Sequence, residues 1–356
     1  MTTIPHIGQQ MVEPQLETHA PAAAGGLVDQ FGRVFDYLRI AVTDRCNLRC
    51  IYCMPEEGID FARNEQLLSR AEILRVIRIA ARLGVRKIRY TGGEPLLRKD
   101  ILELIRGASQ TPGIDSIQLT TNGIFLTDQA AELRQAGLDG VNISLDTLDA
   151  AKFLKITRRT GVAQVLAGMR AALETGFSSV KINVVAMRGF NDDELGDFVA
   201  LTKDAPITVR FIELMPFDAH QIWKTGRYFG FDMIRKNLMN LFPDLNTVSG
   251  SATEGVVFQA PGHAGKVAII PSYTRSICST CNRVRLTADG QIRNCLYSTT
   301  EHDLRAVLRN GGSDEDVAQL LKTAMWLKLK DGWDAQNEHD PGVTHHERES
   351  MTQIGG

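Results

Sequence analysis

The stretch VFDYLRIAVTDRCNLRCIYCMP (34–55) decides the fold, because a predicted strand runs directly into a loop of closely spaced cysteines. Within it, residues 35–43 alternate between apolar side chains and polar ones such as Arg39, which is the pattern of a strand with two different faces. The loop that follows holds Cys46, Cys50 and Cys53. Reactive groups gather at this end of the strands in α/β barrels, so the loop is a candidate for the reactive face.

The same strand–helix unit repeats along the chain. Strands are predicted at 35–43, 85–91, 116–121, 140–146, 179–187 and 207–215. Helices are predicted near 69–83, 99–109, 127–136, 162–175 and 193–202. Strands that alternate with helices favour a parallel sheet with right-handed crossovers. We therefore predict an α/β fold, a partial (β/α)6 TIM-type barrel with a C-terminal cluster-binding extension.

One side-chain phase of the predicted strands is polar. Its members are Arg39 and Thr43; Lys87, Arg89 and Thr91; Gln118, Thr120 and Asn122; Asn142, Ser144 and Asp146; Lys181 and Asn183. A strand covered by helices on both faces would be almost continuously apolar, so the polar phase predicts a lumen that holds a polar, anionic ligand. A one-sided sheet with its polar face in water is the alternative.

We divide the chain into three parts. Residues 1–32, rich in Pro, Ala, Gly and Gln, are predicted to be a mobile N-terminal tail, residues 33–220 the barrel, and residues 221–356 a second region packed against it. The C-terminal region has shorter predicted elements, at 266–272, 301–309 and 315–329.

Composition excludes several classes of protein. The 356 residues are 43% hydrophobic and 23% charged, as in an ordinary globular protein, and the formal net charge of −2 excludes a broadly basic nucleic-acid surface. No apolar run approaches the roughly 18 residues that a membrane helix needs. The first 30 residues show no secretory signal, so we expect a cytoplasmic protein that acts without nucleic acid or membrane.

Six cysteines fall into two groups of three. The second group lies in CSTCNRVRLTADGQIRNC (278–295) and consists of Cys278, Cys281 and Cys295. Three thiols cannot pair completely, and a structural zinc ion takes four ligands, so the spacing indicates two iron–sulfur clusters with one open iron each. Arg283 and Arg285 alternate beside the second group, as in a site for an anionic, nitrogen-containing substrate. Unreactive buried cysteines or a zinc-stabilised protein are the alternatives.

Four segments resemble the motifs of the radical S-adenosylmethionine (radical SAM) superfamily. They are CNLRCIYCMP (46–55), TGGEPLLR (91–98), NISLDTLD (142–149) and ELMP (213–216). With CNRVRLTADGQIRNCL (281–296) and the terminal Gly355-Gly356, the chain is similar to the GTP 3′,8-cyclase family of lyases within that superfamily.

This resemblance implies two [4Fe–4S] clusters and SAM as cofactors and GTP as substrate. A 5′-deoxyadenosyl radical would remove hydrogen from ribose C3′, and C3′ would attack C8 to form 3′,8-cyclo-7,8-dihydro-GTP, the first step of molybdenum cofactor biosynthesis. It further implies an electron donor and a cyclic pyranopterin monophosphate synthase that uses the product. The oligomeric state is left open, a homodimer among the options. A radical SAM peptide-maturation enzyme with an auxiliary cluster and a non-enzymatic iron–sulfur sensor are the competing functions.

The resemblance also implies roles for single residues. The two cysteine groups would hold the clusters. SAM would contact Tyr52, Gly93, Ser144 and Met215. GTP would contact Arg39, Arg89, Thr120, Lys181, Arg283 and Arg285. The catalytic set would be Arg39, Arg283, Arg285, Gly355 and Gly356.

Overall fold

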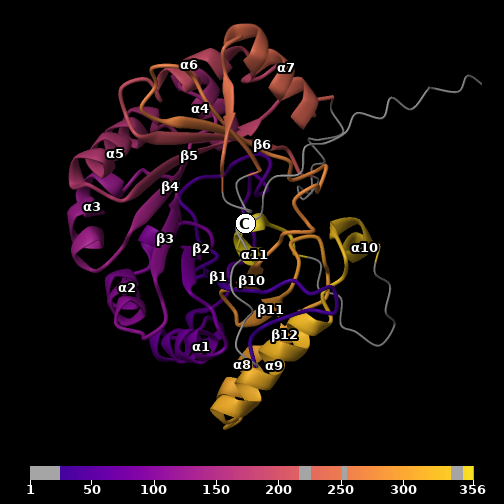
Figure 1. Cartoon of the computed structure of the whole chain (residues 1–356). Helices are drawn as coiled ribbons and strands as arrows, with labels where there is room; N and C mark the ends of the chain where they lie inside the picture. Colours follow the sequence, from indigo (N-terminus) through magenta and orange to yellow (C-terminus); the bar gives the residue numbers. More distant parts are fainter. Residues whose placement is uncertain (1–24, 216–225, 251–254, 338–347, 356) are drawn as a thin grey trace, which may run out of the picture.

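The computed structural model describes residues 25–215, 226–250, 255–337 and 348–355. Six parallel strands form the centre of its sheet: β1 (Tyr37–Ala41), β2 (Lys87–Thr91), β3 (Ser116–Thr121), β4 (Gly140–Ser144), β5 (Ser179–Ala186) and β6 (Ile207–Glu213). The strands curve around a centre and the helices lie outside them (Figure 1). The order of the strands is linear and does not close, which confirms the predicted partial barrel.

The helices of the barrel follow the strands in alternation. They are α1 (Arg70–Arg82), α2 (Ile101–Ser109), α3 (Leu126–Gln135), α4 (Ala150–Thr157), α5 (Val162–Thr175) and α6 (Leu195–Ala200), with short 3-10 turns η1 (Asn64–Gln66), η2 (Pro95–Leu97) and η3 (Asp192–Glu194). Ser69 and Glu72 form a capping box at the start of α1, a pattern that the spacing of these two residues already indicates. The sequence analysis did not predict helix α4. No helix in the described parts of the chain is long and apolar enough to cross a membrane.

C-terminal residues extend the same sheet at both edges. One edge continues from β6 through β9 (Lys266–Ile270), β8 (Val256–Gln259) and β7 (Asn246–Val248); the other continues from β1 through β10 (Arg283–Leu286), β11 (Gln291–Arg293) and β12 (His302–Asp303). Both β9 and β10 pair in parallel with the barrel. Backbone ladders thus join the C-terminal region to the barrel as one sheet, and the division of the chain at residue 220 stays a prediction.

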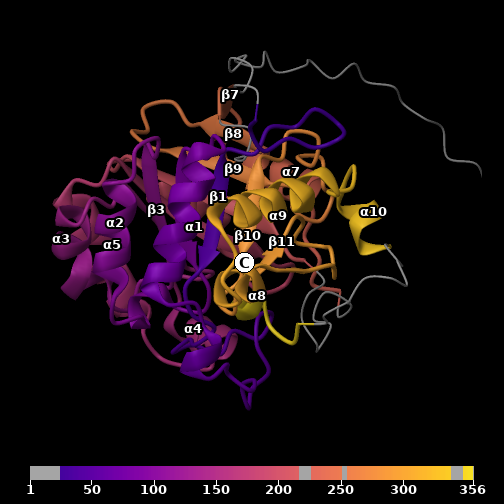
Figure 2. The same ribbon diagram turned by 90° about the horizontal axis from the view of Figure 1, so that it is seen from below.

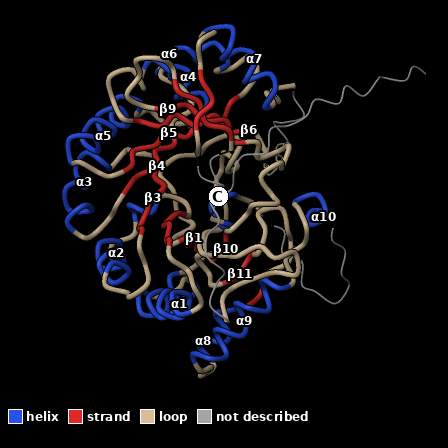
Figure 3. Tube along the Cα trace, in the orientation of Figure 1, coloured by secondary structure: helices blue, strands red, loops and turns tan. Residues whose placement is uncertain are grey.

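The remaining helices also belong to the C-terminal half. They are α7 (Phe231–Leu241), α8 (Leu304–Arg309), α9 (Asp314–Trp326), α10 (Gly332–Gln336) and α11 (Met351–Ile354). Figure 2 shows α8 and α9 beside β10 and β11, whereas most of the barrel helices lie on the outer surface in Figure 3. The end of the chain, with α11, lies at the centre of the barrel (Figure 1).

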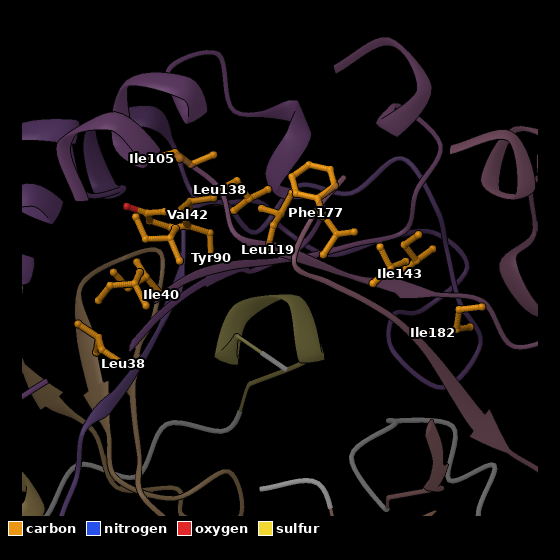
Figure 4. Close-up of a cluster of buried hydrophobic side chains, with 14 of the residues drawn as sticks. Leu38, Ile40, Val42, Tyr90, Ile105, Leu119, Leu138, Ile143, Phe177 and Ile182 are labelled. Atoms are coloured by element: carbon orange, nitrogen blue, oxygen red, sulfur yellow. The ribbon is translucent and has the colours of Figure 1, made fainter. Parts of the chain in front are cut away.

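The apolar phase of the strands forms the core between sheet and helices. Leu38, Ile40, Tyr90, Leu119 and Ile143 are fully buried, and they point toward the helices in Figure 4. Because side chains alternate along a strand, their polar neighbours must face the interior of the barrel. The predicted division into an apolar outer and a polar inner face is therefore present.

Residues at the end of the expected N-terminal tail are packed. Leu27 is 1% exposed, and its N–H donates to the carbonyl of Leu83. Asp29 is buried in an ion pair with Arg33 at 2.5 Å. The packed part of the chain therefore begins before residue 33, because an apolar side chain and a buried ion pair hold this segment; residues 1–24 lie outside the described part.

Candidate active site

Both groups of cysteines line one cavity inside the barrel. The cavity has a volume of about 340 Å³, and its wall includes Cys46, Cys50 and Cys53 from the loop after β1. It also includes Cys278, Cys281 and Cys295, which flank β10 and β11. Two groups more than 200 residues apart in sequence thus line a single cavity.

The first cysteine loop is held against the turn after β2. The N–H of Gly93 donates to the carbonyl of Thr43 at 2.8 Å, and the N–H of Glu94 donates to the carbonyl of Arg45 at 2.8 Å. A Cβ atom on Gly93 would lie 2.1 Å from the Arg45 oxygen, so only glycine permits this approach. Close packing of this turn against the backbone of the cysteine loop therefore explains the Gly-Gly pair of the GGEP segment.

Glu94 lies at the centre of the same turn and is completely buried. Its carboxylate accepts hydrogen bonds from the N–H groups of Leu96 and Asn122 and from the hydroxyl of Thr121, at 2.7 to 3.0 Å. Burial raises the pKa of Glu94 to about 7, against the lowering effect of these hydrogen bonds. Glu94 thus joins the loops after β2 and β3 from inside the protein.

The first trio supplies three free thiols from one loop. Burial, and then the charge of Glu94, raise the pKa of Cys46 to about 11. Burial, and then the charge of Cys46, raise the pKa of Cys53 to about 12. Three cysteine side chains are a ligand set for a [4Fe–4S] cluster with one open iron, and a bound cluster would stabilise their thiolates.

The second trio has a different electrostatic environment. Although burial raises the pKa of the Cys281 thiol, the charges of Lys328 and Arg283 lower it to about 7. Lys328 itself is only 3% exposed. The positive surroundings favour the thiolate of Cys281, which is the form that binds iron, whereas burial raises the pKa of Cys278.

The four residues predicted to contact SAM all line the cavity: Tyr52, Gly93, Ser144 and Met215. The Tyr52 hydroxyl donates to Asp146 at 2.7 Å, and Asp146 also accepts from the N–H of Val185 at 2.7 Å. Burial raises the pKa of Asp146 to about 6. The loop of the first trio is thereby tied to the end of β4, where a ligand of the open iron would lie.

Five of the six residues predicted to contact GTP also line the cavity: Arg39, Arg89, Thr120, Arg283 and Arg285. Lys181 does not. It shares a face of β5 with Asn183, which lines the cavity, but it lies two residues nearer the amino end of the strand. The contact predicted for Lys181 stays a prediction.

The pairing of β1 with β10 concentrates positive charge. The register sets Arg39 opposite Arg285 and Tyr37 opposite Arg283. Burial, and then the charge of Arg285, lower the pKa of Arg39, whereas burial lowers that of Arg285 to about 10. Arginines that destabilise one another in this way are stabilised by an anion between them.

The C-terminal segment enters this site. Gly355 has φ +67°, and its carbonyl accepts a hydrogen bond from Nη1 of Arg285 at 2.9 Å. The Ser350 hydroxyl donates to the carbonyl of Cys53 at 2.8 Å. The predicted site residue Gly355 therefore lies beside the arginines, and Gly356 lies outside the described residues.

Several cavity residues were not predicted as site residues. They are Asn183, Arg210, Arg275, Asn294 and Lys328. Nη2 of Arg210 donates to Oδ1 of Asn183 at 2.5 Å across β5 and β6. The alternation of the strands had already placed Asn183 on the polar phase, and the same alternation along β6 could have found Arg210, whereas no sequence pattern pointed to Lys328 or Arg275.

Comparison with family models divides the chain into two matched parts. Residues 40–202 match the radical SAM superfamily, and residues 207–332 match the family Molybdenum Cofactor Synthesis C. The GTP 3′,8-cyclase of Chlorobaculum tepidum is 46% identical over 330 residues, covering 93% of this chain and 97% of that protein. The chain belongs to the GTP 3′,8-cyclase family.

Other similar proteins agree with membership of the GTP 3′,8-cyclase family. The mitochondrial GTP 3′,8-cyclase of Arabidopsis thaliana is 45% identical and covers 85% of this chain and 77% of its own. Human molybdenum cofactor biosynthesis protein 1 is 42% identical, but only 50% of its length is covered. Among solved structures, Streptococcus suis SuiB bound to S-adenosylmethionine has a TM-score of 0.55 with 14% identity, over 76% of this chain and 63% of that one, which shows a common fold.

Proposed function

We propose that this protein is a radical SAM lyase that converts GTP into 3′,8-cyclo-7,8-dihydro-GTP, the first step of molybdenum cofactor biosynthesis. Membership of the GTP 3′,8-cyclase family supports the reaction. The observation that carries the proposal is that both cysteine trios and a group of arginines line one cavity. One end of this space is suited to SAM and the other to a nucleotide.

The first trio would hold a [4Fe–4S] cluster whose open iron takes SAM. When bound and reduced, this cluster supplies the electron that releases the 5′-deoxyadenosyl radical from SAM. The protein positions SAM beside this cluster and encloses it. Tyr52 and Asp146 fix the loop of the trio against β4, while Gly93 brings the backbone of the next loop close to it. Ser144 and Met215 complete the proposed contacts with SAM.

The second trio would hold a cluster whose open iron takes the guanine base. Arg39, Arg283 and Arg285 would then orient the nucleotide and balance its negative charge, because guanidinium groups bind phosphate oxygens in pairs. Arg89, Thr120 and Lys181 are the further proposed contacts; Lys181 is kept because it shares the inner face of β5. The wall of the cavity limits the hydrogen donors that a carbon radical could reach in place of C3′.

The C-terminal glycines and the two halves of the chain also have roles in this proposal. Gly355, and with it Gly356, would complete the wall beside Arg285. We propose that residues 33–220 generate the radical and residues 221–356 present GTP. An electron donor, a cyclic pyranopterin monophosphate synthase that uses the product, and a cytoplasmic location complete the proposal, with a homodimer among the options for the oligomeric state.

The decisive experiment is a GTP-dependent assay with anaerobically reconstituted protein. With reductant, SAM and GTP, the protein should form 5′-deoxyadenosine and a cyclised nucleotide in equal amounts, and should hold about eight irons, as expected for two [4Fe–4S] clusters. Cys281→Ser should abolish cyclisation while some SAM cleavage remains. Cys50→Ser should abolish both reactions.

The same assay separates the competing functions. SAM cleavage that ignores GTP but responds to a peptide would favour a peptide-maturation enzyme. An iron-loaded protein that never consumes SAM and binds DNA with a steep salt dependence would favour a sensor. Zinc without iron would contradict both cluster sites.

A further inference from the structure

One buried arginine beside the second cysteine trio lies outside the proposed contacts. Arg275 lies three residues before Cys278 and lines the cavity, yet its side chain is held by aromatic rings. Its Cζ lies 3.6 Å from the ring centroid of Tyr297 and 3.7 Å from that of Trp333. A guanidinium between two rings at these distances is fixed in position and orientation.

The stack joins three segments that surround the second trio. Tyr297 follows Cys295 by two residues, and the Arg275 carbonyl accepts the N–H of Cys278 at 3.0 Å. Trp333 belongs to α10, and the preceding Gly332 packs so closely that a Cβ there would lie 2.7 Å from Tyr297. The position of Arg275 therefore affects the placement of two cysteines in the trio.

The charge of Arg275 lacks a counterion in the described parts of the chain. Arg275 is 4% exposed, and its Nε and Nη1 atoms are buried without a hydrogen-bond partner there. Nη2 donates to the neutral Oε1 of Gln336 at 2.5 Å. Burying an unpaired cation is costly, and cation–π contacts offset only part of that cost. An anion in the adjoining cavity would supply the missing compensation.

The backbone conformation of Arg275 also indicates a functional role. Its φ is +59°, a left-handed conformation that non-glycine residues seldom adopt. Such conformations persist where the surroundings over-determine them, and they gather at functional sites. Here the two rings and the Cys278 hydrogen bond provide that constraint.

We propose that Arg275 is a positioning residue for the second [4Fe–4S] cluster: its stacked guanidinium fixes the loops of Cys278 and Cys295 and places a positive charge beside the cluster. The inference rests on the proposed function, which supplies the second cluster. A cluster bound by three thiolates is negatively charged and becomes more so on reduction. A fixed cation nearby favours the reduced form and so raises the reduction potential.

The test isolates the second cluster. In the background Cys46→Ser, Cys50→Ser, Cys53→Ser, only the second site should assemble iron after anaerobic reconstitution. In that background, we compare the parent protein, which keeps Arg275, with the variant Arg275→Gln. The two measurements are the iron content and the reduction potential of the cluster, the latter from an EPR-monitored redox titration. Arg227→Gln is the matched control, because Arg227 also lies over an aromatic ring, that of Phe190 at 5.8 Å, but does not line the cavity.

We expect Arg275→Gln to lower the potential and to reduce iron content at least twofold, whereas Arg227→Gln changes neither. Arg275→Lys keeps the charge without the planar stack, so it should restore the potential more than the iron content. Trp333→Leu, which removes one ring, should reduce iron content as well. In the complementary background Cys278→Ser, Cys281→Ser, Cys295→Ser, the first cluster should keep its potential when Arg275 is changed.

The inference fails if Arg275→Gln has the potential and iron content of its parent. Should the Gln variant not fold, by circular dichroism, the comparison of Arg275→Lys and Trp333→Leu with Arg227→Gln decides by the same two readouts. A parent that binds no iron in the first background contradicts the second cluster itself, and with it the proposed function. The two failures are thus distinguishable.

Discussion

Nη1 of Arg285 donates a hydrogen bond of 2.9 Å to the carbonyl oxygen of Gly355, which joins the last turn of the chain to strand β10. Arg285 lies opposite Arg39 in the β1–β10 ladder, so the bond brings the C-terminus to the arginines of the cavity. Gly355 therefore lies within the barrel, and the effect of changing it can be measured separately from the clusters.

Gly355→Ala should impair cyclisation without loss of iron. Gly355 has φ +67°, and a Cβ there would lie 3.3 Å from Cβ of Ala41 and 3.4 Å from Cγ2 of Thr91. The left-handed backbone alone costs a non-glycine residue about 1–2 kcal/mol, which corresponds to roughly 5- to 30-fold in the population of the correctly placed C-terminal turn. The measurement is the ratio of cyclised product to 5′-deoxyadenosine, which should fall. A variant with the parent ratio would contradict a role for this turn.

Arg348→Ala should loosen the C-terminal residues 350–355, because Arg348 anchors the chain just before them. Nη2 of Arg348 donates to Glu301 at 2.6 Å and Nη1 to Asp289 at 3.0 Å, and these carboxylates hold its pKa above the ordinary value of arginine although burial lowers it. Glu301 is buried and Arg348 only partly so, so breaking these pairs should cost more than the about 0.2–1 kcal/mol of an exposed pair and less than the about 3–5 kcal/mol of a fully buried one. Hydrogen exchange should become faster in residues 350–355, and product formation should fall at least tenfold.

Two variants serve as controls for the Arg348 prediction. Arg348→Lys keeps one ion pair and should fall between the parent and Arg348→Ala. Arg309→Ala breaks a more exposed pair with Glu72, at 2.7 Å, which is worth only about 0.2–1 kcal/mol. It should leave exchange in the tail unchanged. Equal exchange in Arg348→Ala and the parent would show that the tail is held by other contacts.

Glu94→Gln should flatten the dependence of stability on pH. The pKa of Glu94 is raised by burial from 4.5 to about 7, so the folded state holds this proton more tightly than the unfolded state. The contribution is complete below pH 4.5 and is lost as pH rises through 7, by about 3 kcal/mol as an upper estimate. Urea unfolding of metal-free protein between pH 5 and 8 should show a smaller decline in the variant.

Glu72→Gln is the control for this pH effect. Glu72 is partly buried, which raises its pKa, but hydrogen bonds from Arg309 and Ser69 lower it to about 2. Its contribution is therefore lost only as pH falls below 4.5, outside the range measured. A decline in Glu94→Gln as steep as in Glu72→Gln would assign the pH dependence to other groups.

Tyr52→Phe should weaken SAM binding while the first cluster still assembles. The hydroxyl of Tyr52 donates to Asp146 at 2.7 Å, and a hydrogen bond to a charged group contributes about 1.5–3 kcal/mol. We expect the KM for SAM to rise about tenfold or more at unchanged iron content. Tyr90→Phe is the matched control, because the Tyr90 hydroxyl donates to the carbonyl of Leu104 outside the cavity. It should lower stability and leave the KM for SAM unchanged.

Much of the barrel could be predicted because its information is local. The alternation around Arg39 and Ser144 assigns each strand an inner and an outer face, and the capping box at Ser69 marks the start of α1. Helices α4 and α7 and the short strands β7, β8 and β12 were missed. The short elements carry too few residues for a clear periodicity, whereas α7 has 11 residues and was not recognised. The packing of Leu27 was missed because one buried leucine is indistinguishable in sequence from an exposed one.

The amino-acid sequence by itself determined the chemistry: two cysteine trios with iron–sulfur spacing, and strands whose polar phase requires an interior space. Only the tertiary structure decided that β10 lies beside β1, which sets Arg285 opposite Arg39, and that Arg275 lies between Tyr297 and Trp333. The physical reason is that residue type and local spacing act within a few residues of chain. The meeting of segments hundreds of residues apart depends on which packing of the whole sheet buries the most apolar surface.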